Sequence, residues 1–361
     1  MRNNKLEHIL ANIKPLDATL LEKARERTAQ LVMPTRALGR LHDISERLCA
    51  INATLTPSTS KKAILIMAGD HGVAAEGVSA YPQEVTGAMV QTFLDGGAAI
   101  NALARQVGAD VRVVDMGIIP ELPPEIVNNA RQLTICKIAP GTANLATGPA
   151  MKRPQAENAV ITGFECASEL FDTGLDLLGT GDMGIGNTTP SAAIGAVLTD
   201  TSLDEMVGRG TGVDDIGLEL KRSIIKNGIE INHPDPTDGL DVLTKVGGFE
   251  IGGITGCILA GAYHRKPVII DGFISTAGAL VAQALCPIAT DYLFSGHCSA
   301  ETGHRAMLRH LNLEPIFDLE MRLGEGTGAA LAMGVLDAAA SMFKEVMTFD
   351  EAGVAEKNLD R

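Results

Sequence analysis

The sequence predicts an α/β protein whose mostly parallel sheet carries helices on both faces. Strand-length apolar runs such as Ala63–Ala68 are followed by short loops rich in Gly and polar residues, which is typical of buried parallel strands. Segments with apolar residues at helical spacing alternate with these runs. Because hydrophobic residues make up 45% of the 361 residues, a sizeable core is available, and strand–helix alternation on this scale builds a parallel sheet.

The expected elements follow in order along the chain. Residues 1–60 show helical spacing, which Pro34 interrupts. The strands expected after them are 63–68, 111–115, 175–178, 268–271, 292–294 and 315–319. The expected helices are 83–106, 153–172, 189–198, 214–227, 251–263, 276–285, 300–311 and 329–342. We expect residues 120–148 to be rich in loops and the polar tail from Asp350 to be mobile.

The loops that follow the expected strands hold most of the chemically useful side chains. In open parallel sheets, ligands bind outside the carboxyl ends of the strands. The segments expected at this edge combine Gly with Asp, Glu, His, Ser and Thr; they are 69–72, 115–117, 179–190, 271–273, 295–299 and 324–328. The sequence therefore predicts one composite site at this edge.

Composition excludes several classes of protein. The formal net charge of −14, the absence of Trp and an aromatic content of 3% argue against a nucleic-acid partner. Six cysteines lie far apart without a CxxC pair, so reduced thiols are expected rather than a zinc framework or disulfides. The N-terminus has no apolar h-region, and the apolar runs are too short to span a bilayer. We expect a cytoplasmic protein without a membrane partner.

The stretch Met321–Gly328 places one carboxylate, Glu325, among three glycines just before an expected helix. Glycines allow left-handed backbone, and a helix N-terminus favours an anion. Thr327 or Gly328 is the candidate N-cap. A glutamate outside any ion-pair ladder is a candidate general base. The alternative is a Gly-rich turn whose glutamate only faces solvent.

A second glycine-rich segment, Gly179–Gly184, matches the GxGxxG pattern after a strand. The next helix begins only at Thr189, and no second strand ends in an acidic residue about 20 positions on. The motif therefore gives only weak support for NAD binding.

A third segment, Gly208–Gly212, resembles a nest that cradles phosphate, with Lys221 and Arg222 downstream. Ser299 and Arg322 could add phosphate ligands. Taken singly, each of these residues is equally a helix cap or a surface ion pair.

Asp70 and His71 follow the first buried strand and resemble part of a metal site or an acid–base pair. No second cluster with metal-ligand spacing occurs among the eight histidines, so no metal is expected. We interpret His71 as a hydrogen-bonded positioning residue.

Many of these segments together resemble the nicotinate-nucleotide:dimethylbenzimidazole phosphoribosyltransferase family of cobamide lower-ligand assembly. The matching pieces are colinear over roughly residues 30–340. They are ALGRL at 37–41, GDHGV at 69–73, YPQEVT at 81–86, GTAN at 141–144, GPAM at 148–151, GIGNTTP at 184–190, KVGGF at 245–249, DGF at 271–273 and residues 321–333.

The resemblance implies transfer of phosphoribose from nicotinate mononucleotide to a base such as 5,6-dimethylbenzimidazole, giving α-ribazole phosphate and nicotinate. Because the pyridinium is already a good leaving group, a base that removes the azole proton and correct positioning would suffice, without a cofactor. The resemblance also implies a homodimer. Its subunit would combine a Rossmann-like catalytic domain, residues 61–327, with a small helical domain formed by residues 1–60 and the C-terminal helix from about 328–361.

The resemblance also assigns roles to residues. The family's catalytic base matches Glu325, and Asp182 is the supporting carboxylate, one methylene shorter than the glutamate common there. The implied nucleotide and phosphate contacts are Gly184, Asn187, Thr188, Gly210, Lys221, Ser299, Arg322 and Gly324. In the base pocket, Tyr81, Met89 and Met183 stand where family members can carry Ser, Gln and Leu. Bulk and an adaptable thioether predict that other azoles, including purines, are accepted alongside dimethylbenzimidazole.

Two other functions remain open at this point. One is a catalytically weak partner subunit that binds nucleotide and supports an active paralogue, against which the retained Glu325 argues. The other is an NAD-dependent oxidoreductase, which the incomplete dinucleotide motif disfavours.

Overall fold

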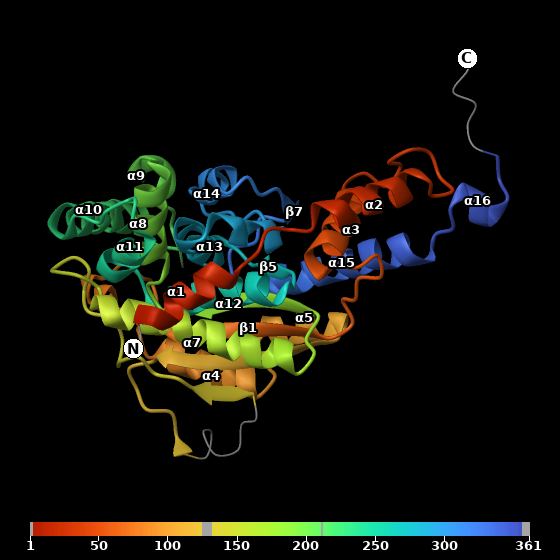
Figure 1. Cartoon of the computed structure of the whole chain (residues 1–361). Helices are drawn as coiled ribbons and strands as arrows, with labels where there is room; N and C mark the ends of the chain where they lie inside the picture. The colour runs from red at the N-terminus through yellow and green to blue at the C-terminus, as the bar shows by residue number, and fades with distance from the viewer. Residues whose placement is uncertain (1–2, 125–131, 211, 356–361) are drawn as a thin grey trace.

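The computed structural model of the chain describes residues 3–124, 132–210 and 212–355 (Figure 1). Its centre is a seven-stranded sheet of order β3-β2-β1-β4-β5-β6-β7 in which every neighbouring pair is parallel. The predicted α/β fold class is therefore confirmed. The strands are β1 (Lys62–Gly69), β2 (Ala109–Gly117), β3 (Leu133–Ile135), β4 (Leu177–Met183), β5 (Val268–Ile270), β6 (Leu293–His297) and β7 (Pro315–Phe317).

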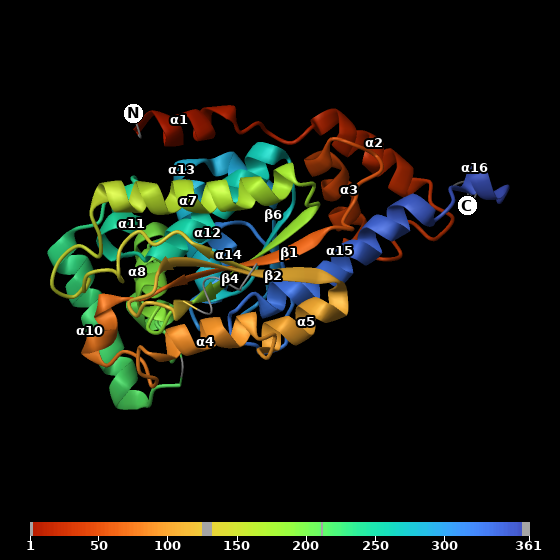
Figure 2. The same cartoon turned by 90° about the horizontal axis from the view of Figure 1, so that it is seen from below.

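Helices cover both faces of the sheet (Figure 2). One face carries α7, α12 and α13, and the other carries α4, α5 and α15. The longer helices are α1 (Asn3–Asn12), α2 (Ala18–Ala29), α3 (Arg40–Asn52), α4 (Val85–Leu94), α5 (Ala99–Val107), α7 (Arg153–Asp172), α8 (Thr188–Thr199), α10 (Asp215–Asn232), α11 (Gly239–Val246), α12 (Phe249–His264), α13 (Phe273–Leu285) and α15 (Thr327–Glu345). Shorter ones are η1 (Gly72–Glu76), α9 (Leu203–Met206), η2 (Pro287–Tyr292), α14 (His304–His310) and α16 (Phe349–Ala352).

The helix α12 lies between the sheet and α7, and its residues from 249 to 262 are all buried. A helix that is apolar on every side is expected in such a position. Glycine lets α7 and α12 touch, because a Cβ at Gly163 would lie 1.9 Å from the carbonyl oxygen of Gly253. This close contact holds α7 against α12, the helix that packs directly on the sheet.

Several expected elements differ from those observed. The single helix expected over 83–106 is two helices, because Gly96 takes a left-handed φ of +74° and ends α4. The expected loop 179–190 begins later, since β4 runs to Met183, and β6 likewise extends to His297. The loop-rich segment contains β3 at the sheet edge. Of the tail from Asp350, residues 350–352 belong to α16, which Thr348 caps; the last six positions, 356–361, lie outside the described residues.

The reversal of strand order places the candidate site. From β1 the chain builds outward through β2 to β3, and later returns to the other side of β1 with β4. The register sets Met67 opposite Asp182 and Ala68 opposite Met183. A crevice opens at such a switch point, so the loops after β1 and β4 meet beside it.

The N-terminal helices divide between two neighbours. Helices α2 and α3 pack with the distal part of α15, where Ala24, Cys49 and Phe343 form a small separate core. Leu31 and Thr348 form a bridge at the same end. Helix α1 instead packs on α7 and α12. The proposed division into a helical domain and a catalytic domain stays a prediction.

In the part of the chain that the structure describes, no helix has both the length and the apolar character needed to cross a membrane.

Candidate active site

The loop from Gly324 to Gly326, just before α15, has an unusual backbone. Gly324, Glu325 and Gly326 have φ values of +82°, +64° and +91°. Left-handed backbone is ordinary for glycine but costs free energy for glutamate. Strain of this kind persists only where the surroundings impose it, which points to Glu325 as a functional residue.

Asp271, directly after β5, imposes that backbone. Its Oδ1 accepts hydrogen bonds from the N–H groups of Gly328 (2.7 Å) and Ala329 (3.1 Å), and its Oδ2 accepts one from Gly326 (3.0 Å). The carboxylate is fully buried, and it satisfies N–H groups that a helix start leaves free. The prediction that Thr327 or Gly328 is the N-cap is therefore wrong. The N-cap position is Gly326, and the side chain that caps the helix is that of Asp271, which follows β5.

Glu325 is 6% exposed, and its Oε2 has no hydrogen-bond partner in the part of the chain that the structure describes. Burial raises the pKa of its carboxyl group above the usual 4.5, the charge of Asp271 adds to this, and a hydrogen bond from the backbone N–H of Ile100 opposes it. The solvent-facing alternative does not fit this burial. Through the N–H of Ile100, Glu325 contacts the first turn of α5. The role of Glu325 as a general base stays a prediction.

Asp182 lies directly beneath this loop at the end of β4. A Cβ on Gly324 would come within 3.1 Å of its Oδ2, so a side chain there would press on the carboxylate. Asn187 donates a hydrogen bond of 2.9 Å to Asp182. Burial raises the pKa of Asp182 well above 3.8, as does the charge of Asp271, while Asn187 opposes the shift.

A cavity of about 80 Å³ opens beside Asp182. Seven residues expected in the site line it: Asp182, Asn187, Thr188, Gly210, Ser299, Arg322 and Gly324. The other lining residues are Gly272, Phe273, Ile274, His297, Glu301 and Leu323. Since pockets for whole small molecules usually exceed about 300 Å³, this cavity fits one end of a nucleotide.

Lys221, on α10, lies next to the cavity and is 1% exposed. Its Nζ donates to Thr188 Oγ1 (2.7 Å) and to the carbonyl oxygen of Gly208 (3.4 Å). Burial lowers the pKa of Lys221 to about 8, and Glu301 acts in the opposite direction. A Cβ on Gly210 would lie 3.1 Å from Nζ. The ammonium, the left-handed Gly210 and Thr188 therefore form one polar wall.

The other basic residues at or near the expected nest, Arg209 and Arg222, form ion pairs with nearby carboxylates. Arg209 forms an ion pair with Asp215 and donates to the carbonyl oxygen of Val213 (3.0 Å), so it serves its own loop. Thr211 lies outside the described residues. Arg222 pairs with Glu219.

The residues expected to contact the base lie on a different side. Tyr81, before α4, is 55% exposed, whereas Met89 and Met183 are partly buried against the core. The loop after β4 is tied to α4, because Ile185 donates its N–H to Thr86 Oγ1 (3.1 Å). None of Tyr81, Met89 or Met183 lines the cavity described above.

Gly184, expected at the nucleotide, instead permits a close backbone contact. A Cβ there would lie 2.2 Å from the carbonyl oxygen of Gly69 and 3.2 Å from His71 Nε2. His71 pairs with Glu250, with 2.8 Å between Nε2 and Oε1, and both are buried. Burial lowers the pKa of His71, but Glu250 and Asp70 outweigh it and the net pKa is raised.

The GxGxxG segment does not form a dinucleotide turn. Gly179 and Gly181 lie inside β4, where they leave room for neighbours: a Cβ on Gly181 would lie 2.6 Å from the carbonyl oxygen of Glu325. The glycines of this motif thus let the loop at 324–326 pack on the sheet. In a dinucleotide-binding turn, a helix would instead start at the last glycine.

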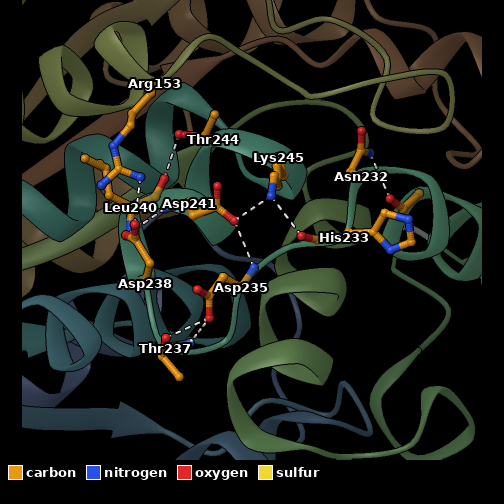
Figure 3. Close-up of polar contacts among 11 residues, drawn as sticks. Arg153, Asn232, His233, Asp235, Thr237, Asp238, Leu240, Asp241, Thr244 and Lys245 are labelled. Carbon is orange, nitrogen blue, oxygen red and sulfur yellow. Dashed lines mark hydrogen bonds and ion pairs between the residues drawn. The ribbon is translucent and has the colours of Figure 1, made fainter.

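The KVGGF segment also has a structural role (Figure 3). Lys245 pairs with Asp241 (2.8 Å) and donates to the carbonyl oxygen of His233 (2.8 Å). Asp241 also accepts from the N–H of Asp235 (2.8 Å). These contacts close the connection between α10 and α11, and so hold the Lys221 helix in place.

Sequence reasoning assigned no role to Asp271, Glu250, His297 or Glu301, although all four are buried at this edge of the sheet. Asp271 was detectable as a carboxylate immediately after a strand. Glu250 and Glu301 carry no signal of their own, because they sit at or near helix starts where a glutamate is common. Their importance depends on which loops the fold brings together.

Three comparisons with known proteins identify the family of the chain. A family model described as Phosphoribosyltransferase (DBI_PRT) matches residues 13–354. A nicotinate-nucleotide–dimethylbenzimidazole phosphoribosyltransferase of Geotalea uraniireducens is 50% identical over 353 residues, 98% of this chain and 99% of the relative. One from Roseiflexus is 50% identical over 354 residues, 98% of each chain. The crystal structure of such an enzyme from Thermus thermophilus matches with a TM-score of 0.89 and 44% identity, covering 95% of this chain and 100% of that one.

Proposed function

The chain belongs to the phosphoribosyltransferase family, and on that basis we propose that it transfers phosphoribose from nicotinate mononucleotide to 5,6-dimethylbenzimidazole or a related base. The products are α-ribazole 5′-phosphate and nicotinate, and the reaction serves assembly of the cobamide nucleotide loop. One observation carries the proposal: a buried Glu325 with left-handed backbone adjoins a cavity that Arg322 lines, and Lys221 lies behind Thr188 of the same cavity.

The chemistry requires little from the protein beyond placement. A bond forms between the azole nitrogen and C1′ of the ribose, and the bond from C1′ to the pyridine nitrogen breaks with its electrons returning to nicotinate. Glu325 accepts the azole N–H proton. Its raised pKa makes it a better proton acceptor than an exposed glutamate, because a useful base has a pKa nearer the working pH.

Asp182 has a supporting role in this proposal. Its buried carboxylate lies under Gly324 and is oriented by Asn187. In its ionised form, which burial disfavours, this fixed carboxylate favours the positive charge that develops on the ribose as the pyridine leaves. The nucleotide phosphate binds at the other end of the cavity, to Lys221, Arg322, Ser299 and the loop at Gly210.

The proposal extends to the base, the assembly and the location. Tyr81, Met89 and Met183 shape a base site that accepts other azoles, including purines. The protein works as a homodimer in the cytoplasm; all six cysteines are free thiols, as expected of a reducing compartment.

Turnover by the purified protein alone tests the proposal. We expect nicotinate mononucleotide and dimethylbenzimidazole to give equimolar nicotinate and α-ribazole phosphate, identified by mass. No product from any base in a panel of benzimidazoles and purines would contradict it. Activity that appears only after a second protein is added would instead support the catalytically weak partner subunit.

A further inference from the structure

Besides Asp182, a second acidic side chain lines the cavity assigned to phosphate. Glu301 lines the cavity with Thr188, Ser299 and Arg322, although it is only 7% exposed. It follows β6 and precedes α14, and its N–H lies 3.3 Å from Ser299 Oγ. A carboxylate is the last group expected in a pocket for a phosphate dianion, because like charges repel at short range.

The loop at Gly208 is shaped around this carboxylate. A Cβ on Gly208 would lie 2.0 Å from Glu301 Oε2, so the carboxylate packs directly against this glycine. Oε2 is buried and has no hydrogen-bond partner among the described residues, which leave out Thr211 of the neighbouring loop. A buried polar atom left unpaired is destabilising, which indicates that another factor keeps the carboxylate here.

The groups that stabilise the carboxylate are those assigned to the substrate. Burial raises the pKa of Glu301 above 4.5, and Lys221, the N–H of Gly210 and Arg322 oppose this rise in part. Lys221 and Arg322 are the charged groups that face it, one from α10 and one from the loop before α15. All three partners belong to the expected phosphate site. In the free protein, Glu301 therefore occupies the electrostatic position of the phosphate.

We propose that Glu301 is an internal competitor for the phosphate subsite, and that it keeps inorganic phosphate from occupying the site. This inference rests on the proposed function, since it takes the cavity as the phosphate end of the nucleotide site. A phosphate can gain Lys221, Gly210 and Arg322 only by displacing or neutralising Glu301. A free phosphate ion has no other contacts to offset that loss, whereas a nucleotide also binds through its ribose and pyridine.

Titration of the purified full-length chain with inorganic phosphate tests the inference. Glu301→Gln keeps the size and one acceptor oxygen but removes the charge. We expect it to bind phosphate at least about tenfold more tightly than the wild type, because two cationic groups lose their internal partner. Glu219→Gln is the matched control: it removes one exposed charge from the helix that carries Lys221, and it should leave phosphate affinity within about twofold.

The outcomes separate the inference from its alternatives. Unchanged phosphate affinity in Glu301→Gln would overturn it, and weaker affinity would show that Glu301 helps to bind phosphate. If only the affinity for nicotinate mononucleotide fell, Glu301 would be a ribose ligand and the inference would again fail. Glu301→Met, neutral and of similar volume, gives the same readout if the glutamine variant does not fold.

The wild-type turnover assay is read separately. If the wild type transfers phosphoribose but Glu301→Gln shows unchanged phosphate binding, the inference alone fails. If the wild type transfers nothing, the proposed function fails whatever the phosphate titrations show.

Discussion

The two ends of the candidate site are built differently. At the expected nucleotide end, Thr188 begins α8 whereas Ser299 and Arg322 lie in two separate loops, yet all three line one cavity beside a buried Lys221. At the base end, Tyr81 is more than half exposed, and Glu325 docks on α5 through the N–H of Ile100. The residues expected to bind the nucleotide thus enclose a cavity, whereas Tyr81, expected to contact the base, is exposed.

This difference indicates an order of events. A preformed polar wall binds its ligand without a large ordering cost, so the nucleotide is expected to bind first. An open base end tolerates azoles of different shape, because few contacts are fixed in advance. Variants at the two ends should therefore affect different steps.

The largest effect is expected for Glu325→Gln. Loss of an acid–base group lowers kcat by a factor of about 10²–10⁴, and the fold should be retained because the amide fits the same space. Glu320→Gln is the control, since Glu320 is exposed and also left-handed, with a φ of +57°. Steady-state transfer to dimethylbenzimidazole measures both; near-full activity of Glu325→Gln would remove it as the base.

The next effect is expected for Asp271→Asn. One of its oxygens becomes a donor that cannot accept from the N–H groups of Gly326 or of Gly328 and Ala329. We expect kcat to fall by about 10², because misplacement of a reacting group by 1 Å can cost that much. The free energy of unfolding should also fall by roughly 2 kcal/mol.

Denaturant unfolding and kinetics of Asp271→Asn separate its two effects. The surface change Asp204→Asn is the control for the loss of one negative charge. A stable Asp271→Asn variant with unchanged kcat would show that Glu325 does not need this anchor.

A smaller effect, confined to the nucleotide end, is expected for Lys221→Met. Loss of a charged hydrogen-bond donor should raise KM for nicotinate mononucleotide by roughly 10- to 100-fold, with less effect on kcat. Lys226→Met is the control, because Lys226 lies exposed on the same helix. Equal changes in KM for both variants would argue against a direct contact.

The pH dependence gives a second measure of the same contact. Burial lowers the pKa of Lys221 to about 8, and the charged form is the one that attracts phosphate. The affinity for nicotinate mononucleotide should therefore be highest below pH 8 and fall as pH rises through that value. Lys221→Arg should remove this alkaline limb, since arginine stays charged; an unchanged limb would assign it to another group.

The smallest effect is expected at the base end. Replacing Tyr81 by Ser together with Met89 by Gln should raise the ratio of transfer to dimethylbenzimidazole over transfer to a purine. The expected rise is less than about tenfold, because pocket contacts of this size discriminate only to that extent. Competition between dimethylbenzimidazole and a purine, with product masses counted, gives the ratio. Exclusive use of dimethylbenzimidazole by the wild type would contradict the predicted breadth.

The sequence predicted the sheet and its helices because apolar periodicity and turn residues are local signals. Reliance on local signals also explains the wrong predictions. Gly179 and Gly181 predicted a loop, yet tertiary packing keeps them inside β4. A single Gly96 was enough to divide an expected helix. The sequence grouped Asn187, Ser299 and Arg322 through the resemblance and through their common edge of the sheet, and the structure brings them together.

The rest of the site depends on contacts between distant segments. Asp271 caps a helix more than fifty residues further along the chain, and no local pattern predicts such a pairing. Glu301 is a candidate functional residue only because Gly208 packs against it and the charge of Lys221 acts on it. Burial of Glu325, which separates a base from a solvent-facing turn, is likewise a property of the folded chain.

Equilibrium binding of nicotinate mononucleotide to Glu325→Gln, without any azole present, tests most directly the claim that the two ends act separately. The account predicts a Kd within about twofold of the wild type, although the same variant has lost transfer activity. A Kd raised tenfold or more would contradict it, because Glu325 would then be part of the nucleotide site rather than the base that meets the second substrate.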